Sequence, residues 1–167
     1  IRYFTNERYD QTNMLESLLC AQAVLHGETI VSYGDIVYEP SAVKQLLQSD
    51  GDVAVMVDVD WRQHYVGRRA HPITEAEAVV MSRRHDVIRI GKIAPEDLEA
   101  NGEFIGLMKL TRGGCELLRR HYDRARALYD GRPFQRAAQF RQAYLTDLLQ
   151  EMVDHGVSIH CEVMRGG

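Results

Sequence analysis

The chain has 167 residues, a length typical of one domain, and we expect one hydrophobic core. Hydrophobic residues make up 45% of the chain and charged residues 26%, as in ordinary globular proteins. A formal net charge of -4 argues against nucleic acid as a partner, because sequence-independent binding needs a basic surface. No apolar stretch approaches the roughly 20 residues that span a bilayer, so no membrane partner is expected. Three widely spaced cysteines favour a reduced, cytoplasmic setting over a disulfide framework.

Strand and helix patterns alternate along the first half of the chain. Residues 1–5, with the sequence IRYFT, predict a short strand. Residues 13–25 carry apolar side chains at helical spacing, and Thr12 or Asn13 is expected to cap that helix. The pattern then predicts, in order, a strand over residues 29–33, a helix over 41–47 that Ser41 could cap, and a strand over 53–57 that is buried on both faces.

The second half continues the alternation. Residues 78–82 and 87–90 are expected to form a β-hairpin, and residues 104–110 a further strand. Two longer helices are predicted over residues 114–129 and 135–155, followed by a strand over residues 157–163. The alternation predicts one α/β domain over residues 1–167 with a parallel or mixed sheet.

The strand over residues 29–33 is followed directly by Gly34 and Asp35. In open α/β sheets, ligands bind at the carboxyl ends of the strands. Gly34 would let a ligand approach the backbone, and Asp35 would supply a hard oxygen ligand for Mg²⁺. The alternative is that Asp35 only caps or turns the chain.

A second apolar strand ends in an acidic pair, Asp58 and Asp60. Side chains at i and i+2 of an extended chain point the same way, so the pair could bind a metal. It could also act as the nucleophile and acid of a phosphatase, but phosphatases of that kind carry the pair on their first strand. A polar strand end is the simpler interpretation.

The loop over residues 61–72 combines aromatic and basic side chains. The guanidinium groups of Arg68 and Arg69 are suited to phosphate or phosphonate oxygens. Trp61 or Tyr65 could hold an alkylammonium group by cation–π attraction. A solvated loop anchored by one buried aromatic residue is the alternative. Among the seven histidines no zinc-binding spacing occurs, so a structural zinc site is not expected.

Five strings in order along the chain carry a resemblance: NMLESL at residues 13–18, IVSYGDIVY at 30–38, VMVD at 55–58, GEFIGL at 102–107 and LTDLL at 145–149. Their order and spacing resemble those of the sugar-phosphate nucleotidyltransferase superfamily. Within it, the sequence is most similar to cytidylyltransferases that act on phosphocholine or on 2-aminoethylphosphonate.

The resemblance implies a doubly wound mixed sheet with the nucleotidyltransferase (Rossmann-like) fold. It also implies Mg²⁺-dependent transfer of a nucleotidyl group, with CTP as the expected donor and a small phosphate or phosphonate as the acceptor. The acceptor oxygen would attack the α-phosphorus in line, and pyrophosphate would leave. A homo-oligomer is compatible with this reading.

The resemblance also assigns expected roles to single residues. Asp35 matches the metal ligand and is the expected catalytic residue. Asn13 matches a position near the acceptor pocket. Glu103 and Asp147 match acids at the acceptor end of the site, where a carboxylate could pair with an ammonium group, and Arg68 or Arg69 would bind the acceptor's phosphonate. The expected substrate-binding residues are therefore Asn13, Tyr33, Asp58, Arg68, Arg69, Glu103 and Asp147.

Two features of the superfamily find no match in this chain. They are a Gly-rich nucleotide loop, expected ahead of Ile1, and a second metal-binding aspartate, expected beyond Gly167. On the family pattern the domain is therefore expected to be incomplete at both ends. The alternative to an enzyme is a non-catalytic remnant of the fold that acts in assembly or regulation.

Overall fold

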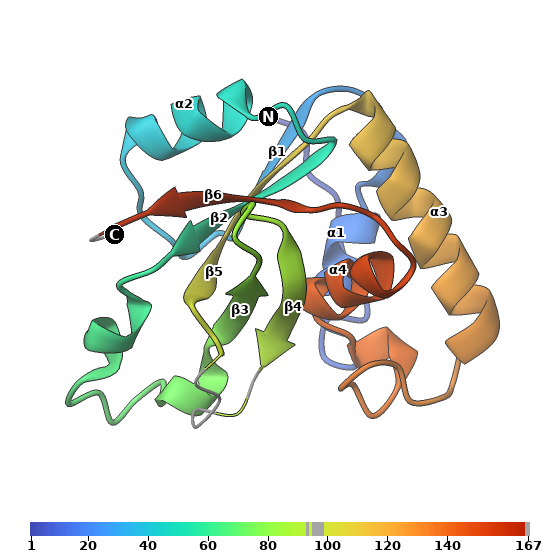
Figure 1. The fold of residues 1–167 in the computed structure, drawn as a ribbon. Coiled ribbons are helices and arrows are strands. Elements are labelled where there is room, and N and C mark those ends of the chain that lie inside the picture. The colour runs from blue at the N-terminus through green and yellow to red at the C-terminus, as the bar shows by residue number, and fades with distance from the viewer. Residues whose placement is uncertain (93, 95–98, 166–167) are drawn as a thin grey trace.

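A six-stranded mixed sheet runs through the middle of the protein in a computed structural model that describes residues 1–92, 94 and 99–165 (Figure 1). The strands follow the order β4-β3-β5-β2-β6, and β1 also pairs with β5. Among the strands of the described residues, β2 and β6 form the only parallel pair, and the other pairs are antiparallel. The predicted α/β class with a mixed sheet is confirmed. The strands are β1 (Thr29–Ser32), β2 (Val53–Asp58), β3 (Glu77–Met81), β4 (Val87–Lys92), β5 (Gly102–Leu110) and β6 (His160–Met164).

Helices cover both faces of this sheet. In Figure 1, α1, α3 and α4 lie on one side of the sheet and α2 lies on the other. None of the helices in the described ranges has the length and apolar character needed to cross a membrane. The helices are α1 (Met14–Leu19), α2 (Pro40–Gln48), α3 (Arg112–Tyr129) and α4 (Leu145–Asp154), with 3₁₀ turns η1 (Gln22–Val24), η2 (Trp61–Tyr65), η3 (Ile73–Glu75) and η4 (Phe140–Gln142).

The strand β2 is buried along its whole length, as its unbroken apolar run predicts. Val55 and Val57 pack in the main core with α1, α3 and α4, whereas Ala54 and Met56 pack with α2 on the opposite face. A third apolar cluster surrounds Trp61, where the segment after β2 covers β3. The face that carries α2 is therefore covered in two places.

Two predictions for the first 25 residues need correction. Residues 1–5 form no strand in the structure, because no backbone hydrogen bond within the described part of the chain joins them to a partner strand. The helix predicted over residues 13–25 ends at Leu19, and a separate 3₁₀ turn follows. Its predicted cap is confirmed, since the side chain of Asn13 accepts the N–H of Met14 at 2.8 Å.

The predicted cap of α2 also needs correction. Ser41 is not a cap, because Pro40 already occupies the first turn of α2.

The helix predicted over residues 135–155 is wrong in its first half. The chain folds back in a tight turn in which Phe134 and Ala137 exchange two backbone hydrogen bonds. Phe140 reaches the core from this irregular segment, so its helical spacing from Tyr144, Leu148 and Met152 is coincidental. The helix begins only after Tyr144, whose N–H donates to the Asp147 carboxylate at 2.8 Å.

The strand β5 holds β1 and β3 along the same edge. β1 pairs with its second half, β3 pairs with its first two residues, and Gly106 lies between them. Gly106 adopts a φ of 82°, and its carbonyl accepts the N–H of Tyr33 at 2.9 Å. A Cβ atom at Gly106 would lie 2.3 Å from the Tyr33 ring, so the ring rests on a position that only glycine can fill.

Replacing Gly106 by alanine should destabilise the protein more than replacing Gly156. Both glycines have a φ of 82°, so each substitution carries a left-handed strain of about 1–2 kcal/mol. Only the Gly106→Ala methyl meets the Tyr33 ring, because no heavy atom lies within 4 Å of the Cβ position at Gly156. Urea unfolding should give a loss about 1–3 kcal/mol larger for Gly106→Ala than for Gly156→Ala. Equal losses would contradict the packing of Tyr33 described above.

Candidate active site

Two clefts open where β1 and β2 end. Both strands run antiparallel to β5, so their carboxyl ends lie at the same edge of the sheet. The acidic cleft, of about 800 Å³, lies between α2 and the segment after β2 and is lined by Asp58 and Glu103. The Asn13 cleft, of about 670 Å³, lies along β1 and α1. Five residues line both clefts and form their common wall: Tyr33, Asp35, His71, Glu75 and Glu77.

Asp35 is an exposed carboxylate of that common wall, and the other exposed carboxylate there, Glu75, is paired with Lys92. Asp35 lies in the turn after β1, two residues after Tyr33 in the sequence. Among the described residues, no group of three or more His, Cys, Asp and Glu side chains could hold a metal ion by itself. A single carboxylate still suits Mg²⁺, which often takes one or two protein carboxylates and completes its shell with water and phosphate. The position of Asp35 therefore fits a metal shared with a phosphate ligand.

Glu77 is the buried carboxylate of the same wall, with only 8% of its surface exposed. Its Oε2 accepts the phenol of Tyr33 at 2.9 Å, and its Oε1 accepts the hydroxyl of Thr146 at 2.7 Å. Burial raises the pKa of Glu77, while the two hydroxyl donors act in the opposite direction. Burial and the neighbouring carboxylate also raise the pKa of Tyr33, so its phenol remains a donor.

A second hydroxyl–carboxylate pair lies inside the acidic cleft. The phenol of Tyr65 donates to Glu103 at 2.5 Å, and the Arg68 guanidinium lies 5.6 Å from the centroid of the Tyr65 ring. Burial raises the pKa of Glu103, and burial together with the hydrogen bond to Glu103 raises the pKa of Tyr65. The pair therefore places an acid, an aromatic face and a cation side by side.

Asp58 is held by its own neighbours. Its Oδ1 accepts the N–H of Asp60 at 2.8 Å, and its Oδ2 lies 3.0 Å from Nε2 of His64. The chain bends after β2, so Asp60 turns away and lies 3.4 Å from Arg165 instead of pointing with Asp58. With 4% of its surface exposed, Asp58 is poorly placed for a phosphatase nucleophile. A partnered strand end is the better description.

The clefts gather most of the predicted site residues but not all of them. Arg69 is exposed and is not among the described residues that line either cleft. Asp147 lines neither cleft, because its carboxylate accepts the N–H of Tyr144, the residue that caps α4, and at 3.5 Å the N–H of Arg136. A substrate contact by Asp147 therefore gains no support. The residues that do line a cleft are Asn13, Tyr33, Asp35, Asp58, Arg68 and Glu103.

Two residues of the clefts, Glu77 and Lys92, are not predicted as site residues from the sequence. Lys92 lines the Asn13 cleft, forms an ion pair with Glu75 and lies 4.9 Å from the centroid of the Tyr144 ring. The one signal for Glu77 was an acid at the start of a strand that is otherwise apolar. Such a residue is usually solvent-facing, so the signal alone would not have identified it.

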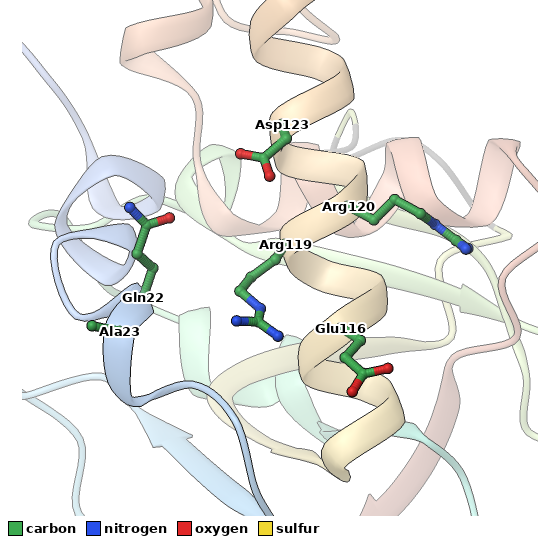
Figure 2. Close-up of a pocket in the computed structure, with 6 residues that line it drawn as sticks. All are labelled: Gln22, Ala23, Glu116, Arg119, Arg120 and Asp123. Carbon is green, nitrogen blue, oxygen red and sulfur yellow. The ribbon is translucent and has the colours of Figure 1, made fainter.

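A separate hollow of about 510 Å³ lies between η1 and α3 (Figure 2). Glu116, Arg119 and Asp123 of α3 line it together with Gln22 and Ala23, and Arg120 points away from those two residues in this view. Its charges are mixed, and it contains none of the predicted site residues. The two clefts at the strand ends are therefore the candidate active site.

Comparison with known proteins defines the class of this fold. The structure resembles the inositol-1-phosphate CTP transferase from T. maritima, with a TM-score of 0.66 and 16% identity over 96% of this chain. It also resembles CMP:2-keto-3-deoxy-manno-octonic acid synthetase, with a TM-score of 0.55 and 14% identity over 91% of this chain. The predicted nucleotidyltransferase fold is confirmed.

The sequence itself points to a narrower likeness. It is 29% identical over 160 residues to the CTP:phosphoglutamine cytidylyltransferase of Campylobacter jejuni, and the matched region covers 91% of this chain. The inferred resemblance to sugar-phosphate nucleotidyltransferases, and its closeness to cytidylyltransferases, is confirmed. No family model matches the chain. The chain spans 60% of the length of that cytidylyltransferase and 55% and 59% of the two solved structures.

Replacing Glu103 by glutamine should stabilise the protein at neutral pH. The raised pKa means that the folded state binds the Glu103 proton more tightly than the unfolded chain does. Ionisation above the ordinary value of 4.5 therefore costs folding free energy, and glutamine avoids that cost while keeping an acceptor for Tyr65. The melting temperature of Glu103→Gln should exceed that of the wild type at pH 7.5, and the gap should close as the pH falls towards 4.5. A difference in melting temperature that does not change with pH would contradict the raised pKa of Glu103.

Proposed function

We propose that the protein transfers a nucleotidyl group, with CTP as the donor, to a small phosphate or phosphonate and releases pyrophosphate. The observation that carries this proposal is the exposed Asp35 in the wall shared by two clefts, at the strand ends of a nucleotidyltransferase fold. The likeness to a cytidylyltransferase supports CTP over other nucleotides. Donor and acceptor would meet at this wall.

The proposed reaction needs little covalent participation by the protein. An oxygen of the acceptor's phosphate attacks the α-phosphorus of the nucleotide, and the bond from that phosphorus to the bridging oxygen breaks as pyrophosphate leaves. Asp35 would hold Mg²⁺, which neutralises charge on the phosphate oxygens when bound. Arg68, at the rim of the acidic cleft, would donate to the acceptor's phosphate. The protein acts mainly by holding the two substrates in line.

The acidic cleft favours an acceptor that carries an ammonium group beside its phosphate. Asp58, Glu77 and Glu103 all line it, and two of these acids are almost fully buried. A cleft of this charge would repel an acceptor that is only anionic, whereas an ammonium group would pair with Glu103 and face the ring of Tyr65. Phosphocholine and 2-aminoethylphosphonate both have this character, so they are the acceptors to test first.

Replacing Asp35 by asparagine should abolish most of the activity. The assay follows Mg²⁺-dependent release of pyrophosphate from CTP with each acceptor, using the protein at its natural length. Partners outside a metal's own ligands already cost about 10–100-fold when removed, so loss of Asp35 should lower the rate at least about 100-fold. Asp130→Asn serves as the matched control, because Asp130 is an exposed acid that lines neither cleft.

A rate for Asp35→Asn within a few-fold of the Asp130→Asn rate would contradict the metal assignment. A wild-type protein that binds neither CTP nor an acceptor would favour the non-catalytic alternative of an assembly or regulatory module. Glycerol 3-phosphate, which has no ammonium group, tests the acceptor class. Equal use of it and of phosphocholine would contradict the role given to Glu103.

A further inference from the structure

The carboxylate of Glu77 joins three separate elements. Glu77 lies on β3. Its carboxylate accepts a hydrogen bond from the hydroxyl of Thr146 on α4 and another from the phenol of Tyr33, directly after β1. Each carboxylate oxygen therefore receives its own hydrogen bond, at 2.9 and 2.7 Å. A buried carboxylate held from two sides has little freedom to move, so it is a fixed point inside the wall shared by the two clefts.

Tyr33 is the side chain that this fixed point holds. Its N–H donates to the carbonyl of Gly106, its ring lies against the bare α-carbon of Gly106, and its edge meets Phe104 at a centroid distance of 5.8 Å. The chain is anchored less firmly beyond it. No hydrogen bond of Gly34 or Asp35 is found in the part of the chain that the structure describes.

We propose that Glu77 is a positioning residue, which acts through Tyr33 to aim Asp35 at the junction of the two clefts. This inference rests on the proposed function in one respect, that Asp35 is the residue that binds the metal. Partners that orient a metal-binding carboxylate without touching the metal commonly set its affinity. Here the orienting contact reaches Asp35 through two peptide units instead of a direct hydrogen bond.

Folding stability alone does not account for Glu77. Burying a carboxylate costs free energy, and burial is the largest cause of its raised pKa. A glutamine or an apolar residue of similar size would avoid that cost at the same place. Glu77 holds Tyr33, which lies next to the turn that carries Asp35. A buried acid that lowers stability is expected at such a place where the geometry of the site matters more than folding stability.

The test compares Tyr33→Phe and Glu77→Gln with Tyr65→Phe. Tyr33→Phe removes only the oxygen that reaches Glu77 and keeps the ring on Gly106, so it should fold even if Glu77→Gln does not. Tyr65→Phe removes the same type of hydrogen bond, to Glu103, in the same acidic cleft, but it has no connection through the chain to Asp35. Thr146→Ser keeps the hydroxyl donor to Glu77 and should behave like the wild type.

Two readouts separate positioning from stability. The first is Mn²⁺ binding in the presence of a non-hydrolysable CTP analogue, measured from the paramagnetic resonance signal of free Mn²⁺. Tyr33→Phe and Glu77→Gln should weaken it about 10-fold, with Tyr65→Phe and Thr146→Ser unchanged. The second is hydrogen exchange of the Tyr33 amide in the protein without ligands, which should become several-fold faster in the same two variants only.

The outcomes distinguish this inference from the proposed function. A wild-type protein that transfers no nucleotidyl group would contradict the proposed function, while exchange of the Tyr33 amide would still test the contact with Glu77. An active wild type whose Tyr33→Phe variant binds Mn²⁺ as tightly as Tyr65→Phe does would overturn the positioning role. An equal loss of Mn²⁺ affinity in Tyr65→Phe would also overturn it, because the effect would then belong to the cleft as a whole.

Discussion

The antiparallel pairing of β5 with both β1 and β2 is the constraint on which the rest of the structure depends. Because both pairings have the same sense, the two strands end at the same edge of the sheet, and the side chains that follow them meet there. Asp35 follows one strand and Asp58 closes the other, although they lie far apart in sequence. Gly106 makes room for the Tyr33 ring between β1 and β3. The two clefts follow directly from this arrangement.

Two acids of the candidate site, Glu77 and Glu103, lie where their burial lowers the folding stability of the protein. Glu77 is buried in the wall shared by the clefts and Glu103 is partly buried in the acidic cleft, and burial raises the pKa of each. Hydroxyl groups of Tyr33, Tyr65 and Thr146 offset part of that cost. Polar groups that are fixed before a ligand arrives need no reorganisation when charge develops, which is the usual gain from such an arrangement. The fold gives up some stability for a preset electrostatic pattern.

Much of the fold could be predicted because its signals are local. The unbroken apolar run of β2 and the amphipathic spacing of α3 each identify an element from a short stretch of sequence. The first half of the predicted 135–155 helix failed because its apolar residues reach the core from a turn, so their spacing carried no helical meaning. A cap made by Tyr144 and Asp147 also lacks the serine or threonine by which such starts are usually found.

The site was harder to predict because its contacts are distant in sequence. Asp35 could be named from the Gly-Asp that follows its strand, but the pairing of Tyr33 with Glu77 joins residues 44 positions apart. No local pattern separates Glu77 from a surface acid at a strand start. The neighbours Arg68 and Arg69 look alike in sequence, and only the path of the loop decides that Arg68 lines the acidic cleft.

The most direct test is a crystal structure of the protein, at its natural length, with a non-hydrolysable CTP analogue and Mn²⁺ in place of Mg²⁺. We predict an anomalous peak within metal–ligand distance, about 2 Å, of an Asp35 carboxylate oxygen where the two clefts meet, with phosphate oxygens completing the shell. A metal bound elsewhere with the nucleotide, and an Asp35 side chain left in solvent, would contradict it.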